Sequence, residues 1–257
     1  MTHTHPTPAP ALAGAATLTW YSLWKLLTNP FIIGFSIGLP IVMYTMFGVG
    51  KDYSDIWIGH ANIAATILAN MALYGVLVSA SSMGTNVSLE RISGVSRLFA
   101  MTPLSSSVII FTRVLASLGV SIIVITVAYI FGYATQARMN PGTWITTGTF
   151  IVLSSILATV LGLAIGYAVR SDGAFAAASM IIVVCAFLSG MFIPLEEMGS
   201  FFKNLAPWSP FYGILNIVQY PMYEGGTFEW KWLAGALAWT VFFVIIAAWA
   251  QSRDTTR

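Results

Sequence analysis

The sequence predicts an all-α integral membrane protein. The predicted architecture has six transmembrane helices, an N-terminal amphipathic helix in the membrane interface, a cytoplasmic helix between spans two and three, and an extracellular re-entrant hairpin between spans five and six. Hydrophobic residues make up 57% of the 257 residues and charged residues only 8%, whereas soluble proteins carry about 25% charged residues. Apolar runs long enough to cross a hydrocarbon core, about 20 residues each, recur along the chain, and the mean hydropathy is +0.81. Membrane lipid is therefore an expected partner, and a net charge of only +2 argues against nucleic acid.

The N-terminal residues precede the first predicted span. Residues 1–15 are rich in Pro, Ala and Thr and lack Lys and Arg, so they are predicted to be a disordered cytoplasmic tail and not a signal peptide. Along residues 16–28, apolar side chains recur at positions i, i+3, i+4 and i+7: Trp20, Leu23, Trp24 and Leu27. This stripe predicts an amphipathic helix that lies in the interface, where indole rings are favoured. The alternative is that these residues begin the first span.

The predicted transmembrane domain covers residues 16–250, and residues 251–257 form a predicted cytoplasmic tail. Its six spans lie at about 31–49, 60–83, 108–133, 144–169, 174–195 and 231–250. With both termini in the cytoplasm, seven Lys and Arg residues lie inside and four outside, as the positive-inside rule requires. The inside residues are Lys25, Arg91, Arg97, Arg113, Arg170, Arg253 and Arg257, and the outside residues are Lys51, Arg138, Lys203 and Lys231. The expected location is the plasma membrane, with both termini cytoplasmic.

Residues 85–108 are the longest charge-bearing interruption between two apolar runs, and they are predicted to be a cytoplasmic surface loop. Apolar residues in this stretch recur at spacings of three and four: Leu89, Ile92 and Val95. That spacing predicts a short amphipathic helix with Glu90 and Arg91 facing away from the stripe, and Thr102-Pro103 ends it. A loop of this size between membrane spans is large enough to contact another protein.

Rows of weakly polar residues cross two of the predicted spans. The second span carries Asn62, Thr66, Asn70 and Tyr74 at a spacing of four, and the third carries Ser117 and Ser121. Such rows are expected to turn away from lipid, because an unpaired polar group in hydrocarbon costs several kcal/mol. They favour either hydrogen bonds between helices or a substrate pathway. In the fourth span the small residues Ala158, Gly162 and Gly166 predict a face for close helix packing.

The residues 194–230 are too interrupted by proline to form a span, yet they are rich in Phe, Trp, Tyr, Leu and Ile. Two short amphipathic pieces, at about 196–206 and 211–220, predict a re-entrant or interfacial hairpin at the outer face. The hairpin could be a lid over an exit, or an aromatic belt that anchors the bundle.

Several function classes lack their characteristic residues. No acidic or histidine side chain lies well inside a predicted span, which argues against a proton- or sodium-coupled secondary transporter, although a secondary transporter or channel is the alternative function. No nucleophile and base pair or metal-ligand cluster is recognisable, so an intramembrane enzyme is not favoured. The Gly48-Val49-Gly50-Lys51 segment lacks the upstream glycine and the following Ser or Thr of a phosphate-binding loop. The chain is therefore not expected to hydrolyse ATP.

Two motifs resemble the ABC-2 type permease family, the membrane subunits of ATP-binding-cassette exporters. The loop resembles the pattern E-R-x-x-G-[TV]-x-[KRE]-x-L/F-x-x-T-P through Glu90, Arg91, Gly94, Val95, Arg97, Phe99, Thr102 and Pro103. The end of the fifth span resembles the pattern S-G-x-x-x-P followed by P-x-x-P-x-Y through Ser189, Gly190, Pro194, Pro207, Pro210 and Tyr212. The similarity covers about residues 16 to 250.

The resemblance implies a permease that moves its substrate outward while a separate ATP-binding-cassette ATPase subunit, present in two copies, hydrolyses ATP with Mg. The permease itself is expected to bind no cofactor or metal, and it would pair with a second copy or a close paralogue. The charge-poor, aromatic spans suit a hydrophobic or amphiphilic cargo, either drug-like or lipid-like. The loop would be a coupling helix that contacts the ATPase through Glu90, Arg91, Gly94, Arg97, Leu98, Thr102 and Pro103. The outer hairpin would form the extracellular gate with Pro194, Phe201, Phe202, Pro207, Trp208, Pro210 and Tyr212.

Overall fold

The computed structural model describes residues 11–95, 106–169 and 171–254, and within them the chain is helical apart from turns and three isolated antiparallel bridges. The N-terminal part consists of α1 (Ala11–Leu27), α2 (Pro30–Ile33), the π-helical turn η1 (Gly34–Gly38) and α3 (Leu39–Gly48). The long helices α4 (Ile63–Ile92), α6 (Ser106–Ala134) and α7 (Pro141–Ala168) follow, and then α8 (Gly173–Leu188). A group of short elements, α9 (Gly199–Leu205), η2 (Ala206–Trp208), α10 (Tyr212–Gln219) and η3 (Tyr220–Met222), leads to α11 (Trp230–Asp254).

Four of the described helices are long and apolar enough to cross a membrane: Ile63–Ile92, Ile110–Ala134, Pro141–Ala168 and Trp230–Gln251. Two further apolar helices, Gly34–Gly48 and Gly173–Leu188, are shorter. They coincide with the predicted first and fifth spans, but they fall below the roughly 20 residues that a perpendicular crossing requires. The integral membrane class is thus confirmed, and the count of six spans stays a prediction.

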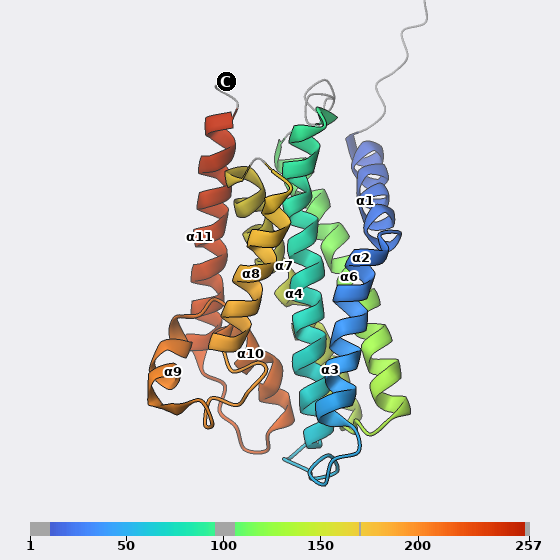
Figure 1. Cartoon of the computed structure of the whole chain (residues 1–257), viewed down its shortest axis with the longest axis vertical. Coiled ribbons are helices and arrows are strands. Elements are labelled where there is room, and N and C mark those ends of the chain that lie inside the picture. Colours follow the sequence, from blue (N-terminus) through green and yellow to red (C-terminus); the bar gives the residue numbers. More distant parts are fainter. Residues whose placement is uncertain (1–10, 96–105, 170, 255–257) are drawn as a thin grey trace, which may run out of the picture.

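Helix α4 is the central helix of the bundle. Its membrane window is 72% buried, whereas that of α11 is 17% buried, and Figure 1 shows α4 in the middle with α3 on one side and α8 on the other. The N-terminus of α4 is fixed by Asn62, whose side chain accepts a hydrogen bond from the Ala65 amide at 2.9 Å. The C-terminal end lies later than predicted. Residues 85–92 belong to α4 and not to a surface loop, with Thr85 and Ser88 fully buried.

The contact between α4 and α7 explains this extension of α4. A Cβ atom on Gly162 would lie 2.1 Å from the Ser81 carbonyl oxygen, and one on Gly84 would lie 2.3 Å from that of Thr159. Only residues without a side chain allow the two backbones to come this close. The predicted small-residue face of the fourth span is therefore confirmed, and α4 supplies the opposing glycine.

The two ends of the bundle hold different connections. Helix α4 ends and α6 begins, and α7 ends and α8 begins, at the end of the bundle where α11 terminates and α1 begins (Figure 1). The opposite end gathers residues 49–62, 135–140 and 189–229. Hydrogen bonds join these three segments, including Asn140 amide to His60 carbonyl at 2.9 Å and His60 amide to Met222 carbonyl at 2.8 Å.

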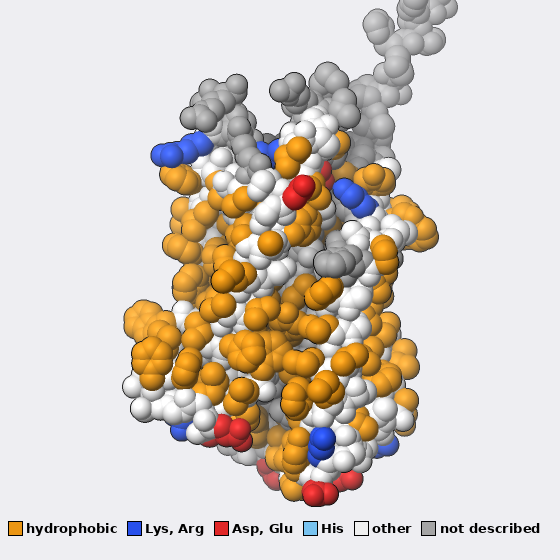
Figure 2. Space-filling view, viewed as in Figure 1, with side chains coloured by type: hydrophobic (Ala, Val, Ile, Leu, Met, Phe, Trp, Pro, Cys, Tyr) orange, Lys and Arg blue, Asp and Glu red, His pale blue; other side chains and the backbone are white. Residues whose placement is uncertain are grey.

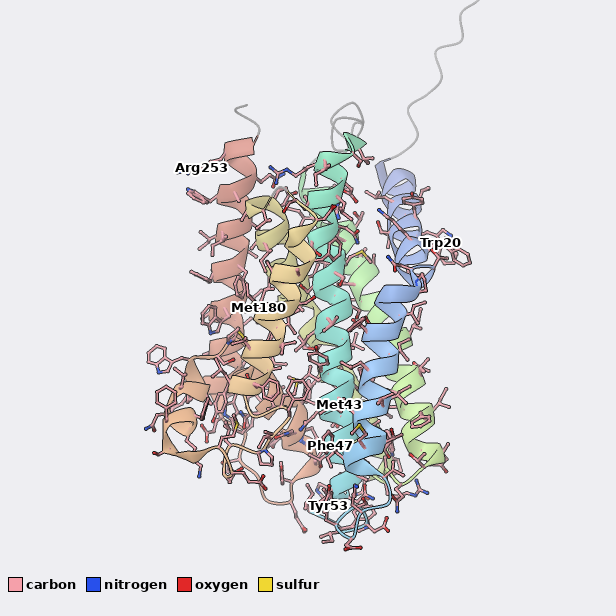
Figure 3. All side chains as sticks on the ribbon, in the orientation of Figure 1. Trp20, Met43, Phe47, Tyr53, Met180 and Arg253 are labelled. Atoms are coloured by element: carbon pink, nitrogen blue, oxygen red, sulfur yellow. The ribbon has the colours of Figure 1, made fainter. Side chains whose placement is uncertain are left out.

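Helix α1 begins at Ala11, before the predicted start at Ala16, and lies beside α6. Leu23 faces α6, since a Cβ atom on Gly119 would lie 2.7 Å from it. Trp20 and Trp24 stack on each other with ring centroids 6.4 Å apart and are mostly exposed, and Figure 3 shows Trp20 pointing away from the bundle. Of the predicted stripe, Leu23 therefore contacts protein, whereas Trp20 and Trp24 point outward. The placement of these two tryptophans in the membrane interface stays a prediction.

Candidate functional site

The end of α4 is joined to α6 by an ion pair. Glu90, in the last turn of α4, accepts a hydrogen bond from the guanidinium of Arg113 in α6. The side chains of Arg113 and Glu90 are 7% and 19% exposed, respectively. Arg113 also lies 3.4 Å from the Met83 carbonyl oxygen. A charge this deeply buried needs its partner, because removing one member of a buried pair leaves an uncompensated charge.

The same turn of α4 is joined to the end of α7. Arg91 donates to the carbonyl oxygens of Gly166 at 3.3 Å and Tyr167 at 2.8 Å, and its guanidinium lies 5.8 Å from the Tyr167 ring centroid. One turn earlier, the Ser88 hydroxyl donates to the Val169 carbonyl at 2.7 Å. Carbonyl groups at a helix C-terminus lack partners within the helix, and a cation satisfies them well. We call Glu90, Arg91, Arg113 and Tyr167 the junction cluster.

The junction cluster differs from the geometry that the sequence predicts. Glu90 and Arg91 are partly buried against the bundle, whereas Ile92 is 56% exposed. The expectation that the two charged residues face away is therefore wrong. The reason is that α4 continues through residue 92 with its small-residue face on α7, and this register turns Glu90 and Arg91 towards α6 and α7.

The remaining predicted coupling residues follow the end of α4. Gly94 has a φ of +76°, a backbone conformation that glycine adopts without strain, so the chain turns directly after the helix. Arg97, Leu98, Thr102 and Pro103 lie outside the described residues. Their contact with an ATPase stays a prediction, but the structure shows that the stretch starts from a turn fixed to two other helices.

The polar row of α4 is buried along its whole length. The Asn62 side chain accepts from the Arg138 amide at 2.9 Å and donates to the Gln136 carbonyl at 2.8 Å. The Gln219 side chain of α10 donates to Asn70 at 2.9 Å. Thr66 is 9% exposed, and Tyr74 packs edge-on against Phe192 with ring centroids 5.1 Å apart. The row thus faces the segments at the end opposite the termini.

The two serines of α6 are fully buried. Ser117 donates to the Val114 carbonyl at 2.8 Å and Ser121 donates to the Ser117 carbonyl at 2.7 Å. Both hydroxyl groups are thus satisfied within their own helix. Packing between helices accounts for this arrangement, and a role of the serines in a substrate pathway stays a prediction.

The segment between α8 and α11, residues 189–229, contains most of the predicted outer hairpin, residues 194–230. It divides into an inner part that packs on the bundle and an outer part that is mostly exposed. The hydroxyl groups of Ser189 and Ser209 lie 2.8 Å apart, which fixes the middle of the hairpin to the end of α8. Beyond this contact Phe211 is fully buried and α10 packs against α11, α7 and α4. A Cβ atom on Gly213 would lie 2.3 Å from the Trp232 carbonyl, so α10 touches the backbone of α11.

The predicted gate residues lie on both parts. Pro210 is buried and Tyr212 half-buried, and both belong to the inner part. Pro194, Pro207, Phe201 and Trp208 are exposed and Phe202 is half-buried.

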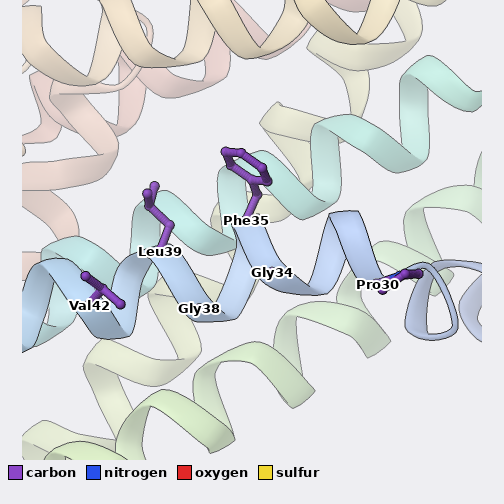
Figure 4. Close-up of a pocket in the computed structure, with 6 residues that line it drawn as sticks. All are labelled: Pro30, Gly34, Phe35, Gly38, Leu39 and Val42. Carbon is purple, nitrogen blue, oxygen red and sulfur yellow. The ribbon is translucent and has the colours of Figure 1, made fainter.

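A shallow apolar groove lies on the outward face of α2, η1 and α3. It has a volume of about 440 Å³ and is lined by Pro30, Gly34, Phe35, Gly38, Leu39 and Val42. Figure 4 shows these residues along α2, η1 and α3. Nothing lies within 4 Å of a Cβ atom built on Gly34 or Gly38, whereas the opposite face packs tightly, since a Cβ atom on Gly75 would lie 2.2 Å from the Ser36 carbonyl.

Comparison with known proteins places these features in a family context. Residues 15–223, from α1 to the end of η3, match the family described as "ABC-2 type transporter". The chain is also similar to a protein of Bacillus subtilis (strain 168) named "Putative transport permease YvfS". The two sequences are 21% identical over 235 residues, which cover 90% of this chain and 94% of the relative.

Proposed function

Since the chain belongs to the ABC-2 type transporter family, and is thus a membrane transport subunit, we propose that it is the permease of an exporter driven by a separate ATPase. The observation that carries this proposal is the family match over residues 15–223, which includes the end of α4 and most of the outer hairpin. The family assignment also favours this function over a secondary transporter or channel.

The proposed topology has six spans in the plasma membrane, with both termini in the cytoplasm. The two shorter helices, α8 and the segment Gly34–Gly48, would complete the six. The distribution of Lys and Arg supports the orientation, because seven of them fall at the proposed inner end and four at the outer end.

The proposed partner is an ATP-binding-cassette ATPase, in two copies. This ATPase, and not the permease, binds ATP and Mg and hydrolyses the ATP. Two copies of this chain, or one copy and a close paralogue, form the membrane part. The stretch from Glu90 to Pro103 contacts the ATPase. In support, this stretch leaves the bundle at a turn whose last helical residues are held by α6 and α7 through the junction cluster.

The proposed mechanism is a shift between two conformations. ATP binding closes the two ATPase subunits and tilts the stretch after Ile92, and the junction cluster passes that tilt to α4, α6 and α7 together. A contact of equal strength in both states would shift nothing, so the ATPase must bind the stretch more tightly in one of them. Because α10 touches both α4 and α11, movement of α4 reaches the outer hairpin.

We propose that the pathway runs along the polar row of α4 and the two serines of α6, and that the outer hairpin is its extracellular gate. The hydrogen bond from Gln219 to Asn70 supports this arrangement, because it links α10 in the proposed gate to the polar row of α4. The proposed cargo is a hydrophobic or amphiphilic, drug-like or lipid-like molecule, and efflux is the proposed direction. The low charge of the spans supports this cargo.

The experiment that tests this function is purification of the tagged chain from its native membranes, identification of any bound ATP-binding-cassette ATPase, and ATP hydrolysis measurements in lipid. The test variant is Arg97→Glu in the proposed contact, and the matched control is Lys203→Glu, a basic residue at the opposite end of the molecule. Wild type and the control should retain the ATPase, whereas Arg97→Glu should lose it or lose stimulated hydrolysis. Absence of any bound ATPase with wild type would refute the exporter and leave the secondary transporter or channel.

A further inference from the structure

Helix α9 is amphipathic, but its apolar face is directed away from the protein. Phe201, Leu205 and the adjacent Trp208 lie on one side of the helix at a spacing of three to four residues, and Lys203 lies on the other. Phe201 is 70% exposed and Trp208 is 76% exposed. No residue of α9 is buried. A helix stripe of this kind normally packs on a core, so α9 requires another apolar partner.

The position of α9 indicates which partner this is. The contact between Ser209 and Ser189 places the segment after α9 at the end of α8, and Trp230, which is 75% exposed, begins α11 in the same region. The membrane window of α11 is apolar and only 17% buried, so most of its surface is exposed and, in the proposed topology, available to face lipid. Figure 2 shows hydrophobic side chains gathered over α9 at the lower left, with charged side chains below them. The apolar face of α9 therefore continues the lipid-facing surface at its boundary.

The charges beside α9 agree with this boundary position. Glu196 and Glu197 precede the helix and are exposed, and Lys203 lies on its polar face. Exposed tryptophan and phenylalanine next to such charges are typical of helices that lie in the headgroup region, where the rings enter the bilayer and the charges face water.

We propose that α9 and Trp208 form an anchor in the headgroup layer at the end of the bundle opposite the termini, and that its partner is the lipid surface. The proposal rests on the membrane placement in the proposed function but not on the ATPase. Phe201 and Trp208 then contact lipid and do not line the gate, which is left to the inner part of the hairpin with Pro210 and Tyr212. The outer hairpin is thereby held between the bundle and one leaflet.

The test is the membrane depth of single spin labels. Cys185 is the only cysteine, so Cys185→Ser provides a background for Phe201→Cys and for the matched control Lys203→Cys, an exposed residue on the opposite face of the same helix. The labelled chains are reconstituted in vesicles of phosphatidylcholine and phosphatidylglycerol. Accessibility to oxygen, which enters lipid, is compared with accessibility to a water-soluble nickel chelate.

The anchor predicts a higher ratio of oxygen to chelate accessibility at residue 201 than at residue 203, with residue 201 about 5–10 Å below the headgroup surface. Equal, chelate-dominated values at both residues would place α9 in water and refute the anchor. A label at 201 that is shielded from both reagents and coupled to its copy in another chain would instead show a protein interface, and would also refute it. A second measurement keeps Cys185 and uses no spin label. In this chain, Trp208→Phe should reduce the part of the tryptophan fluorescence that brominated lipids quench. All these outcomes are independent of ATPase binding.

Discussion

At the residue scale, the charged side chains of the junction cluster are buried or partly buried in the bundle. Arg113 has a 7% exposed side chain and its Nε atom has no hydrogen-bond partner among the described residues. Its charge is balanced by Glu90, which the sequence motif suggested as a contact for another protein. Glu90 compensates a buried charge and also borders the proposed ATPase contact. It therefore couples the stability of the bundle to the geometry of that contact.

Replacing Glu90 should therefore destabilise the permease itself. Glu90→Gln leaves the buried guanidinium without its counter-charge, which is expected to cost about 3–5 kcal/mol and to lower the thermal unfolding midpoint in detergent. The exposed Glu197→Gln is the matched control and should leave the midpoint unchanged. The double variant Glu90→Arg with Arg113→Glu should recover part of the loss. An unchanged midpoint for Glu90→Gln would show that the pair contributes nothing to stability.

Arg91 is expected to hold the end of α7. Each hydrogen bond to a charged group contributes about 1.5–3 kcal/mol, and Arg91 makes two of them to α7 carbonyls. Arg91→Met should raise amide hydrogen exchange in peptides that cover residues 165–171, while Arg91→Lys, which keeps the charge, should raise it less. Identical exchange in all three proteins would contradict the contact.

At the element scale, α4 runs between the two ends of the molecule and packs on other helices near each of them. α4 has 30 residues, contacts α7 through glycines near its C-terminal end, and contacts α10 through Asn70 near its N-terminal end. We propose that α4 moves as a rigid body, so that a displacement at Ile92 is carried to the outer hairpin without an intervening loop.

The glycine contact between α4 and α7 should be intolerant of a single methyl group. A Cβ atom at residue 162 would lie 2.1 Å from a backbone carbonyl, whereas at Gly235 of α11 nothing lies within 4 Å. Gly162→Ala is expected to separate the helices and destabilise the bundle by about 1–3 kcal/mol, while Gly235→Ala should be neutral or stabilise its helix by up to about 1 kcal/mol. Thermal unfolding in detergent measures both, and equal effects would show that the helices do not approach this closely.

At the scale of the whole molecule, the two ends are chemically different. The end with the termini carries the junction cluster, Lys25 and Arg253, whereas the opposite end carries most of the acidic residues, among them Asp52, Asp55 and Glu224. This asymmetry is the basis of the proposed orientation, since positive residues favour the cytoplasmic side.

Labelling of intact cells tests that orientation. In the Cys185→Ser background, Asn204→Cys lies at the proposed outer end and Ser93→Cys at the proposed inner end, and both positions are exposed. A membrane-impermeant maleimide should label residue 204 in intact cells and residue 93 only after permeabilisation. The reverse pattern would place the termini outside.

The sequence alone predicted features that depend on composition or on spacing along one helix. The membrane class follows from the low charge, the glycine face of α7 follows from Gly162 and Gly166, and the two amphipathic pieces of the outer hairpin follow from Pro207 and Pro210. These features need no knowledge of neighbouring segments, because helix geometry alone relates residues three or four positions apart.

Only the tertiary structure decided where each face points. Glu90 and Arg91 turn inward because Gly84 of α4 packs on Gly162, far away in the sequence. The outer hairpin divides because the Ser209 hydroxyl is hydrogen-bonded to the Ser189 hydroxyl at the end of α8. This contact leaves α9 outside the bundle and α10 inside it. An amphipathic pattern states that a helix has an apolar face, but the partner of that face depends on contacts between distant segments. In a membrane protein lipid and protein interior are equally apolar, so hydrophobicity could not distinguish between them here.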